Sequence, residues 1–327
     1  MRPKTPSFDA LIQNQGICLS TEGRSQNTID WYASNLRRFL KFLRDRKLPD
    51  EVQDIGVAEA RSFIFYLQNE VTRWESSLYT REKKRLSPFS VQGYARTIKA
   101  FWSWLAAEGY ISNNPMEKMK IPRVPQKVIA TFTPEQIKKM VVCLDLNKTS
   151  EFRNYTIILL FLDTGIRISE LTNIKLENVD FKQSCLLVRG KGNKERIVPF
   201  GTQVRRILWR YISSYRVEPQ SSEDAFLLLT NSGKPLRRNA VRLMLMRLGI
   251  KAGISGVRCS AHTFRHTFAK QYLMQGGDIF SLQRILGHSS LEMVKVYVNL
   301  ASSDVAQQHR KFSPVDNVVL AKNRRNS

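Results

Sequence analysis

Two segments near the start of the chain repeat one pattern of apolar and polar positions. TIDWYASNLRRFLKFL, which begins at Thr28, and SVQGYARTIKAFWSWL, which begins at Ser90, carry apolar side chains at matched steps of three and four residues. That spacing places them on one face of an α-helix, and the opening hydroxyl of each segment suits an N-cap. We therefore predict two amphipathic helices whose apolar faces form a core. Basic side chains on the outer surface of the first helix have two interpretations, a solvated charged face or a contact with DNA.

The larger second part of the chain is also mainly helical, with one exception. In TPEQI, Thr133, the following proline and Gln136 make up a capping box at a helix start. NYTIILLFLDTGIRISEL predicts a buried helix that ends at Gly165 and leads directly into another helix. CLLVRGKGNKERIVPF predicts two short strands around a glycine-rich turn that carries Lys191. The helical pattern then resumes, so the expected fold class is α+β, mainly α with a small antiparallel β-sheet.

Residues 116–130, MEKMKIPRVPQKVIA, separate the two parts. They combine prolines with four basic side chains and carry no apolar periodicity. Proline favours an extended, semi-rigid connection. We therefore predict a helical domain at 1–115, a linker at 116–130, a larger domain at 131–310 and a polar tail at 311–327.

The charge balance points to a polyanionic partner. The 327 residues include 52 Lys and Arg against 28 Asp and Glu, a net charge of +24, which exceeds what solubility requires. Four well-separated cysteines argue against a disulfide framework or a structural zinc site and suit a reducing compartment. The N-terminus has no apolar signal core, and the longest apolar run, TIILLFL at 156–162, is too short to span a bilayer. We therefore expect a cytoplasmic protein without a membrane partner.

Two catalytic motifs can be weighed and set aside. His262 and His266 in SAHTFRHTFA have the spacing of a zinc protease helix, but Thr263 stands where that motif needs a glutamate. Arg265 would also lie unfavourably beside the cation. FLDTG at 161–165 matches an aspartic protease tripeptide, yet it closes a helical run and no second copy exists. Because a P-loop sequence is also absent, we expect neither a metal site nor a nucleotide cofactor.

The remaining polar residues suit phosphoryl transfer. An arginine fork matches two non-bridging phosphate oxygens and stabilises the charge of an in-line transition state without a metal ion. A tyrosine hydroxyl can attack phosphorus, and a lysine can give a proton to the departing alkoxide. Each residue also has a structural interpretation when taken singly, such as Arg167 pairing with Glu170. The candidates are Arg167, Lys191, His262, Arg265, His288 and Tyr297.

The order of four motifs distinguishes between these interpretations. TGIRISEL, VRGKGNKERIVPF, AHTFRHTFA and LGHSSLEMVKVY resemble, in this order, the motifs of the tyrosine recombinase or phage integrase family. The resemblance covers nearly the whole chain: residues 1–115 are similar to that family's helical, DNA-binding core-binding domain, and 131–310 to its catalytic domain. The short stretch before residue 8 favours a simple recombinase of the Xer or transposon type.

The resemblance implies a role for each candidate. The two arginines would hold the scissile phosphate with support from His262 and His288. Lys191 would protonate the departing 5′ oxygen, and Tyr297 would attack phosphorus to form a 3′-phosphotyrosyl bond. His266 is not part of this clamp in the family, and we expect it to be structural.

The resemblance further implies how strands are rejoined and which partners are needed. A phosphotyrosyl ester keeps the energy of the cleaved bond, so resealing needs no ATP, metal or other cofactor. The expected partner is double-stranded DNA with a specific site, bound by a homotetramer or by an assembly with a related recombinase. Two alternatives stay open: a topoisomerase-like enzyme that reseals one strand without exchange, and a non-catalytic DNA-binding protein. The host role is also open among chromosome dimer resolution, phage integration and transposon movement.

Overall fold

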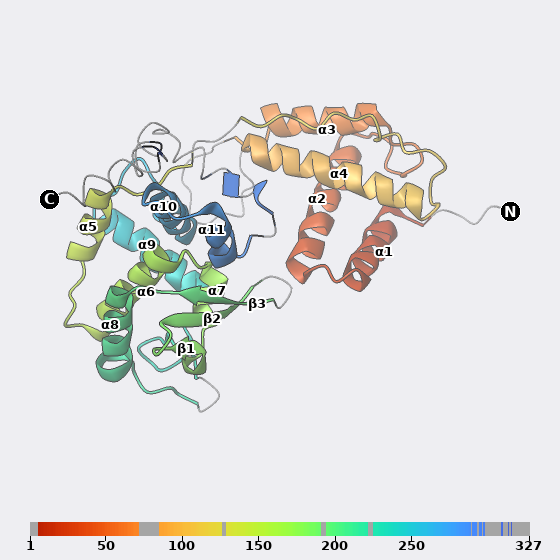
Figure 1. Ribbon diagram of the computed structural model, residues 1–327. Coiled ribbons are helices and arrows are strands. Elements are labelled where there is room, and N and C mark those ends of the chain that lie inside the picture. The colour runs from red at the N-terminus through yellow and green to blue at the C-terminus, as the bar shows by residue number, and fades with distance from the viewer. Residues whose placement is uncertain are drawn as a thin grey trace. The chain divides into compact units, whose positions relative to one another are not determined.

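The chain forms two compact units, each with its own hydrophobic core (Figure 1). The computed structural model describes residues 6–71, 85–125, 129–190, 194–221, 225–288 and 290–292, together with positions 294, 295, 297, 309, 313 and 315. Contacts within the chain divide it into Met1–Lys127 and Val128–Ser327.

The described residues of the first unit form four helices: α1 (Phe8–Thr21), α2 (Gln26–Asp45), α3 (Val57–Asn69) and α4 (Pro88–Ala107). The two repeated sequence patterns form α2 and α4, which pack against each other and against α3, while α1 packs against α2 (Figure 1). The apolar positions matched between the two patterns are buried, except for the partly buried Tyr32, so the prediction of two core helices is confirmed. These positions include Leu36, Phe39, Leu40, Leu43, Tyr94, Ile98, Phe101, Trp102 and Leu105.

Both helices begin one turn earlier than predicted. The N-cap of α2 is Ser25, and that of α4 is Ser87, whose Oγ accepts a hydrogen bond from the backbone N–H of Ser90 (3.1 Å). Pro88 then occupies the first helical position, where its fixed φ suits a helix start. The predicted caps at Thr28 and Ser90 were therefore wrong. In α4 the physical reason is the Ser87 hydroxyl, which caps the helix three residues upstream of Ser90; in α2 the serine three residues upstream of Thr28 makes no side-chain cap hydrogen bond.

The chain after α4 folds back onto the first core. Met116 and Met119 are buried in it, where the unbranched thioether side chain can fill irregular space. Lys99 Nζ on α4 donates hydrogen bonds to the carbonyl oxygens of Glu117 (2.7 Å) and Met119 (3.2 Å). The first residues of the predicted linker, 116–130, thus take part in the packing of the first unit. The limits of the linker otherwise remain a prediction.

The second unit contains a small antiparallel sheet. Its strands β1 (Val179–Asp180), β2 (Cys185–Arg189) and β3 (Glu195–Pro199) lie in the order β1-β2-β3. The last two are the predicted hairpin, and their register pairs Val188 with Arg196. The first strand was not predicted, because two residues are too few to show an alternating pattern.

In the second unit, α6 (Thr149–Thr164) packs against α8 and α10. The capping box predicted at the start of α5 is confirmed: Thr133 Oγ1 accepts from Gln136 N (3.2 Å), and Gln136 Oε1 accepts from Thr133 N (3.1 Å). The described part of this unit is mainly helical, as predicted. Its other helical elements are α5 (Pro134–Val142), α7 (Ile168–Thr172), a 3₁₀ turn (Leu176–Asn178), α8 (Thr202–Arg210), a π turn (Tyr211–Tyr215), α9 (Arg238–Lys251), α10 (Ala261–Met274) and α11 (Ile279–Leu286).

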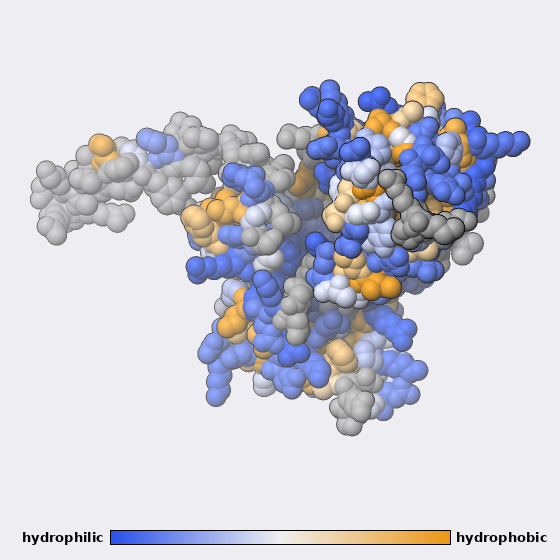
Figure 2. Space-filling model, turned by 90° about the vertical axis from the view of Figure 1, so that its right-hand side faces the viewer, coloured by the Kyte–Doolittle hydropathy of each residue, from blue (hydrophilic) through white to orange (hydrophobic). Residues whose placement is uncertain are grey.

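The surface is mostly polar on the face shown in Figure 2. Hydrophilic side chains cover most of the described residues there, and apolar side chains occur in small patches. Large exposed apolar residues such as Trp31, Trp209 and Ile250 come from separate elements, which is ordinary for a folded surface. A membrane-crossing helix would have to be longer and more apolar than any that the described ranges contain.

Candidate active site

A tight turn after α6 places the first candidate residue. Gly165 ends this helix, as predicted, with a left-handed φ of 59°, and Arg167 is the N-cap of α7 two residues later. A Cβ atom on Gly165 would lie 2.4 Å from the ring of Phe268. Glycine is therefore required both by the backbone conformation and by the close approach of α10.

Arg167 is held by a buried carboxylate that also binds a second arginine. Glu170 is 2% exposed. Its Oε1 accepts from Arg167 Nη1 (2.9 Å) and Arg196 Nη1 (2.7 Å), and its Oε2 accepts from Arg196 Nη2 (2.9 Å) and the Arg167 backbone N–H (2.7 Å). Burial alone would raise the pKa of Glu170, but the hydrogen bonds and charges of the two arginines outweigh it, so the pKa lies below its ordinary value. The Glu170 carboxylate therefore stays ionised and holds the Arg167 side chain in place.

Arg265 lies in the middle of α10 and is 4% exposed. Its Nη1 donates to the carbonyl of Gly165 (2.7 Å), and its Nη2 donates to the carbonyl of Leu286 (2.7 Å) and contacts His288 Nε2 (2.9 Å). Burial and the charge of Arg167 lower the pKa of Arg265 to about 10, so it remains charged at neutral pH. This side chain therefore connects the turn after α6 with the turn after α11.

Arg167 and Arg196 both donate hydrogen bonds to backbone carbonyls at the end of α11. Gly287 caps this helix with φ 64°, and its carbonyl accepts from Arg167 Nη2 (3.2 Å). A Cβ atom on Gly287 would lie 3.0 Å from the guanidinium of Arg196, whose Nε donates to the carbonyl of Ile285 (2.8 Å). Packing of α11 against α10 and β3 brings this turn into place (Figure 1). The glycine between Leu286 and His288 is thus explained by geometry.

Arg167, Arg196 and Arg265 form an arginine cluster, and His288 is a neutral side chain that contacts Arg265. Burial and then the charges of Arg265 and Arg167 lower the pKa of His288 to about 4. Because a guanidinium only donates hydrogen bonds, Nε2 of His288 is the acceptor of the bond from Arg265 and the ring proton is assigned to Nδ1.

Tyr297 lies near Arg265 and Arg167 and is 3% exposed. Its ring belongs to an apolar group with Phe268, Leu282 and Leu286, and its hydroxyl lies 2.9 Å from Nδ1 of His266. Burial raises the pKa of Tyr297, although the nearby arginines act in the opposite direction. The hydroxyl is therefore a neutral phenol at pH 7, and it lies within the electrostatic reach of the arginine cluster.

Two candidates stand apart from these contacts. His262 is on the first turn of α10, with its ring centroid 6.5 Å from that of His266. Burial and the charges of Arg265 and neighbouring arginines lower the pKa of His262, so it too is mostly neutral at pH 7. Lys191 belongs to the connection between β2 and β3 and lies outside the described residues.

Three residues gain importance from the structure. Glu170 and Arg196 were not singled out from the sequence as site residues, although glutamate three residues after Arg167 is the local signal of a capping box. Arg196 gave no comparable signal, because its partners come from α7 and the end of α11. His266 was expected to be structural, whereas its Nδ1 contacts the Tyr297 hydroxyl.

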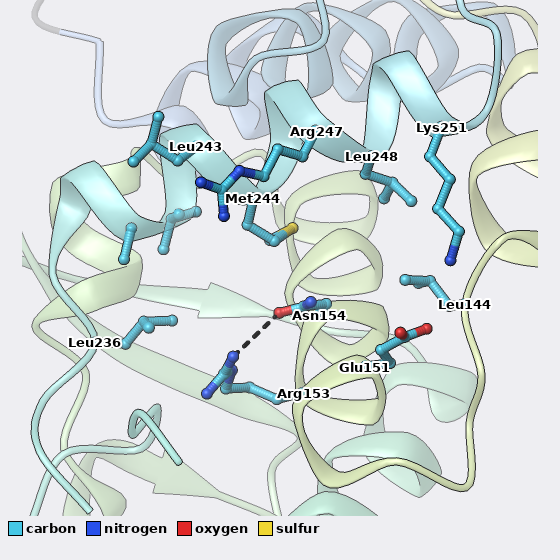
Figure 3. Close-up of a pocket in the computed structure, with 12 residues that line it drawn as sticks. Leu144, Glu151, Arg153, Asn154, Leu236, Leu243, Met244, Arg247, Leu248 and Lys251 are labelled. Carbon is cyan, nitrogen blue, oxygen red and sulfur yellow. Dashed lines mark hydrogen bonds between the residues drawn. The ribbon is translucent and has the colours of Figure 1, made fainter. Parts of the chain in front are cut away.

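Other parts of the second unit do not offer the same chemistry. Asp163 of the FLDTG segment lies near the end of α6 and accepts a hydrogen bond from Gly201 N (2.6 Å), a structural role. A pocket between α6 and α9, lined by residues such as Arg153, Met244 and Leu248, contains none of the candidate residues (Figure 3). Among the described residues, no three His, Cys, Asp or Glu side chains lie close enough together to bind a metal ion.

Replacement of the buried carboxylate is expected to destabilise the second unit. Glu170→Gln removes the charge that pairs with Arg167 and Arg196, and breaking a buried ion pair typically costs about 3–5 kcal/mol. Glu195→Gln is the matched control, because the pair of Glu195 with Arg189 is exposed and such pairs contribute at most about 1 kcal/mol. Urea unfolding at pH 7 measures both. Equal stability of the two variants would contradict this account of the Glu170 cluster.

The contribution of the Glu170 carboxylate to the stability of the second unit should also depend on pH. The folded pKa of Glu170 lies below its ordinary value of 4.5, so its contribution is fully present above that value. It is lost as the pH falls through the folded pKa. The difference in stability between the original protein and Glu170→Gln should therefore shrink in acid.

Known proteins resemble most of this chain. Residues 130–304 match the phage integrase family, and residues 14–121 match the phage integrase SAM-like domain. The chain is 32% identical over 279 residues to the tyrosine recombinase XerC of Anoxybacillus flavithermus, covering 84% of this chain and 88% of that protein. It is 30% identical over 294 residues to the tyrosine recombinase XerD of Staphylococcus aureus, covering 90% and 94%.

Solved structures share the fold. The Tn1549 transposon integrase in complex with transposon right end DNA superposes with a TM-score of 0.71 at 20% identity, covering 94% of this chain and 100% of that chain. A lambda integrase dimer bound to a core site gives a TM-score of 0.66 at 20% identity, covering 88% and 97%. At this identity the likeness shows the common architecture.

Proposed function

The chain belongs to the phage integrase family of tyrosine recombinases, as its motifs predicted, and we propose that it is a site-specific recombinase acting through a 3′-phosphotyrosyl intermediate. Its substrate is double-stranded DNA. The observation that carries the proposal is the placement of Arg167, Arg265 and Tyr297 around the 286–288 turn.

The two arginines are suited to bind the scissile phosphate. A guanidinium has five N–H donors. Arg265 makes hydrogen bonds with Gly165, Leu286, His288 and Tyr297, and two hydrogen bonds fix the side chain of Arg167. Each guanidinium therefore keeps at least one further donor for phosphate oxygens. The Arg167 side chain is 32% exposed, which lets DNA reach it. His262 and His288 support the same oxygens in this proposal.

The reaction follows from these positions. Tyr297 Oη attacks phosphorus, the bond to the 5′ oxygen breaks, and Lys191 gives the departing oxygen a proton. The resulting ester keeps the energy of the original phosphodiester. The 5′ hydroxyl of a second strand can therefore attack it and rejoin the DNA without ATP.

Covalent cleavage is expected to continue in the presence of excess EDTA. Arg167 and Arg265 supply the positive charge that Mg²⁺ supplies in other phosphoryl transfer sites. The measurement is the yield of covalent protein–DNA adduct on a nicked DNA duplex, whose cleavage releases a short 5′ fragment and traps the ester. Loss of the adduct on chelation, with recovery on adding metal, would contradict the proposed roles of the arginines.

Strand exchange distinguishes this function from a topoisomerase-like activity. Both activities use the same catalytic groups, but only a recombinase joins strands from two different duplexes. We propose that the exchange takes place in the cytoplasm, in a tetramer formed by this chain or with a related recombinase. Recombined product from two differently labelled DNA sites would support the proposal, whereas resealing of the original strands alone would favour the topoisomerase-like alternative. DNA binding without a covalent adduct would favour the non-catalytic one.

A further inference from the structure

The proposed reaction leaves one proton without an acceptor. Lys191 supplies a proton to the 5′ oxygen, but Tyr297 must lose its phenolic proton as it attacks. A phenol with a pKa near 10 is ionised to about one part in a thousand at pH 7, and burial raises the pKa of Tyr297 further. A neighbouring base is therefore needed for fast attack.

His266 is in contact with the atom that reacts. It follows Arg265 on α10, and its Nδ1 lies 2.9 Å from the Tyr297 hydroxyl, with the two ring centroids 5.5 Å apart. This is the distance of a hydrogen bond through which a general base acts. The other histidine ring near Tyr297, that of His288, has its centroid 6.4 Å away, and its Nε2 is engaged by Arg265.

The surroundings of His266 keep its ring neutral before the reaction. Burial, followed by the electrostatic effects of His262 and Arg265, lowers the pKa of His266. A neutral imidazole can carry its proton on Nε2 and accept at Nδ1. Arginine side chains cannot accept a proton from the phenol, because they are already protonated.

We propose that His266 is a catalytic residue, the general base for Tyr297; this inference rests on the proposed function. As Oη bonds to phosphorus, its proton passes to Nδ1 of His266. The bond from phosphorus to the 5′ oxygen breaks, its electron pair leaves on that oxygen, and Lys191 protonates it. In rejoining, the 5′ hydroxyl returns a proton to the lysine and attacks phosphorus. The bond to Oη then breaks, and His266 gives its proton back to the tyrosine.

His266→Asn tests whether proton acceptance matters beyond a hydrogen bond. The asparagine amide oxygen can occupy roughly the place of Nδ1 and accept a hydrogen bond, but it does not take up a proton at neutral pH. Adduct formation on the nicked duplex should slow by ~10² to 10⁴-fold, the usual contribution of general base catalysis. DNA affinity and the thermal unfolding midpoint should be unchanged. His309→Asn, at an exposed histidine of the same unit, is the matched control and should cleave at the original rate.

A fluorinated tyrosine at position 297 separates proton transfer from positioning. Its phenol is more acidic and depends less on a base, so it should largely restore the rate of His266→Asn. It should not restore Lys191→Ala, whose defect lies at the leaving oxygen. Cleavage by His266→Asn at the original rate, or a slow rate that fluorotyrosine does not restore, would overturn the role of His266. Absence of a Tyr297 adduct with the original protein would instead overturn the proposed function.

Discussion

Tyr297→Phe is expected to form no covalent adduct with DNA while binding DNA as the original protein does. The substitution removes the attacking oxygen and keeps the ring, which packs in the apolar group with Phe268, Leu282 and Leu286. The lost hydroxyl contacts are those to His266 and Arg265, and each costs about 1 kcal/mol, too little to unfold the unit. The measurement pairs denaturing gel electrophoresis of the adduct with fluorescence anisotropy of labelled DNA.

Tyr272→Phe provides the matched control for this loss. Tyr272 lies on α10, packs against the same apolar group and shares a hydrogen bond with Ser281 (2.7 Å). Removal of its hydroxyl should leave adduct formation intact, because the hydroxyl lies outside the proposed chemistry. A persistent adduct in Tyr297→Phe would show that another residue is the nucleophile.

Lys191→Ala is expected to slow cleavage by ~10² to 10⁴-fold, the typical effect of losing a general acid. Without the lysine, the 5′ oxygen has to leave as an unprotonated alkoxide. A substrate in which sulfur replaces this bridging oxygen has a leaving group that needs no proton. It should therefore restore the rate of Lys191→Ala and leave Tyr297→Phe inactive. Rates of adduct formation on the oxygen and sulfur substrates measure both effects.

Lys194→Ala is the matched control on the same hairpin. The backbone carbonyl of Lys194 accepts from Gly190 N (2.8 Å), and this bond does not depend on the side chain. The Lys194→Ala variant should therefore cleave DNA at the original rate. If the sulfur substrate did not restore the cleavage rate of Lys191→Ala, Lys191 would not be the general acid and would only contact the phosphate. His262 would then be the next residue to test as the acid.

The sequence by itself determined the features that depend on near neighbours along the chain. The spacing of apolar residues in α2 and α4 marks their buried faces, since each turn of helix brings positions three and four apart together. The end of α6 at Gly165 and the capping box at Thr133 are equally local. The ordered motifs also named the family and the six candidate residues, five of which lie in the described part of the second unit.

Only the tertiary structure decided which atoms of these residues meet. Arg167 and Arg196 share Glu170 because α7 packs against β2, which pairs with the strand β3 that carries Arg196. His266 and His262 are equivalent in helical spacing, yet His266 is the one whose Nδ1 contacts the Tyr297 hydroxyl. Local spacing fixes the face of a helix on which a side chain lies. The partner that it meets is supplied by segments far away in the sequence, and their positions follow from the packing of the whole unit.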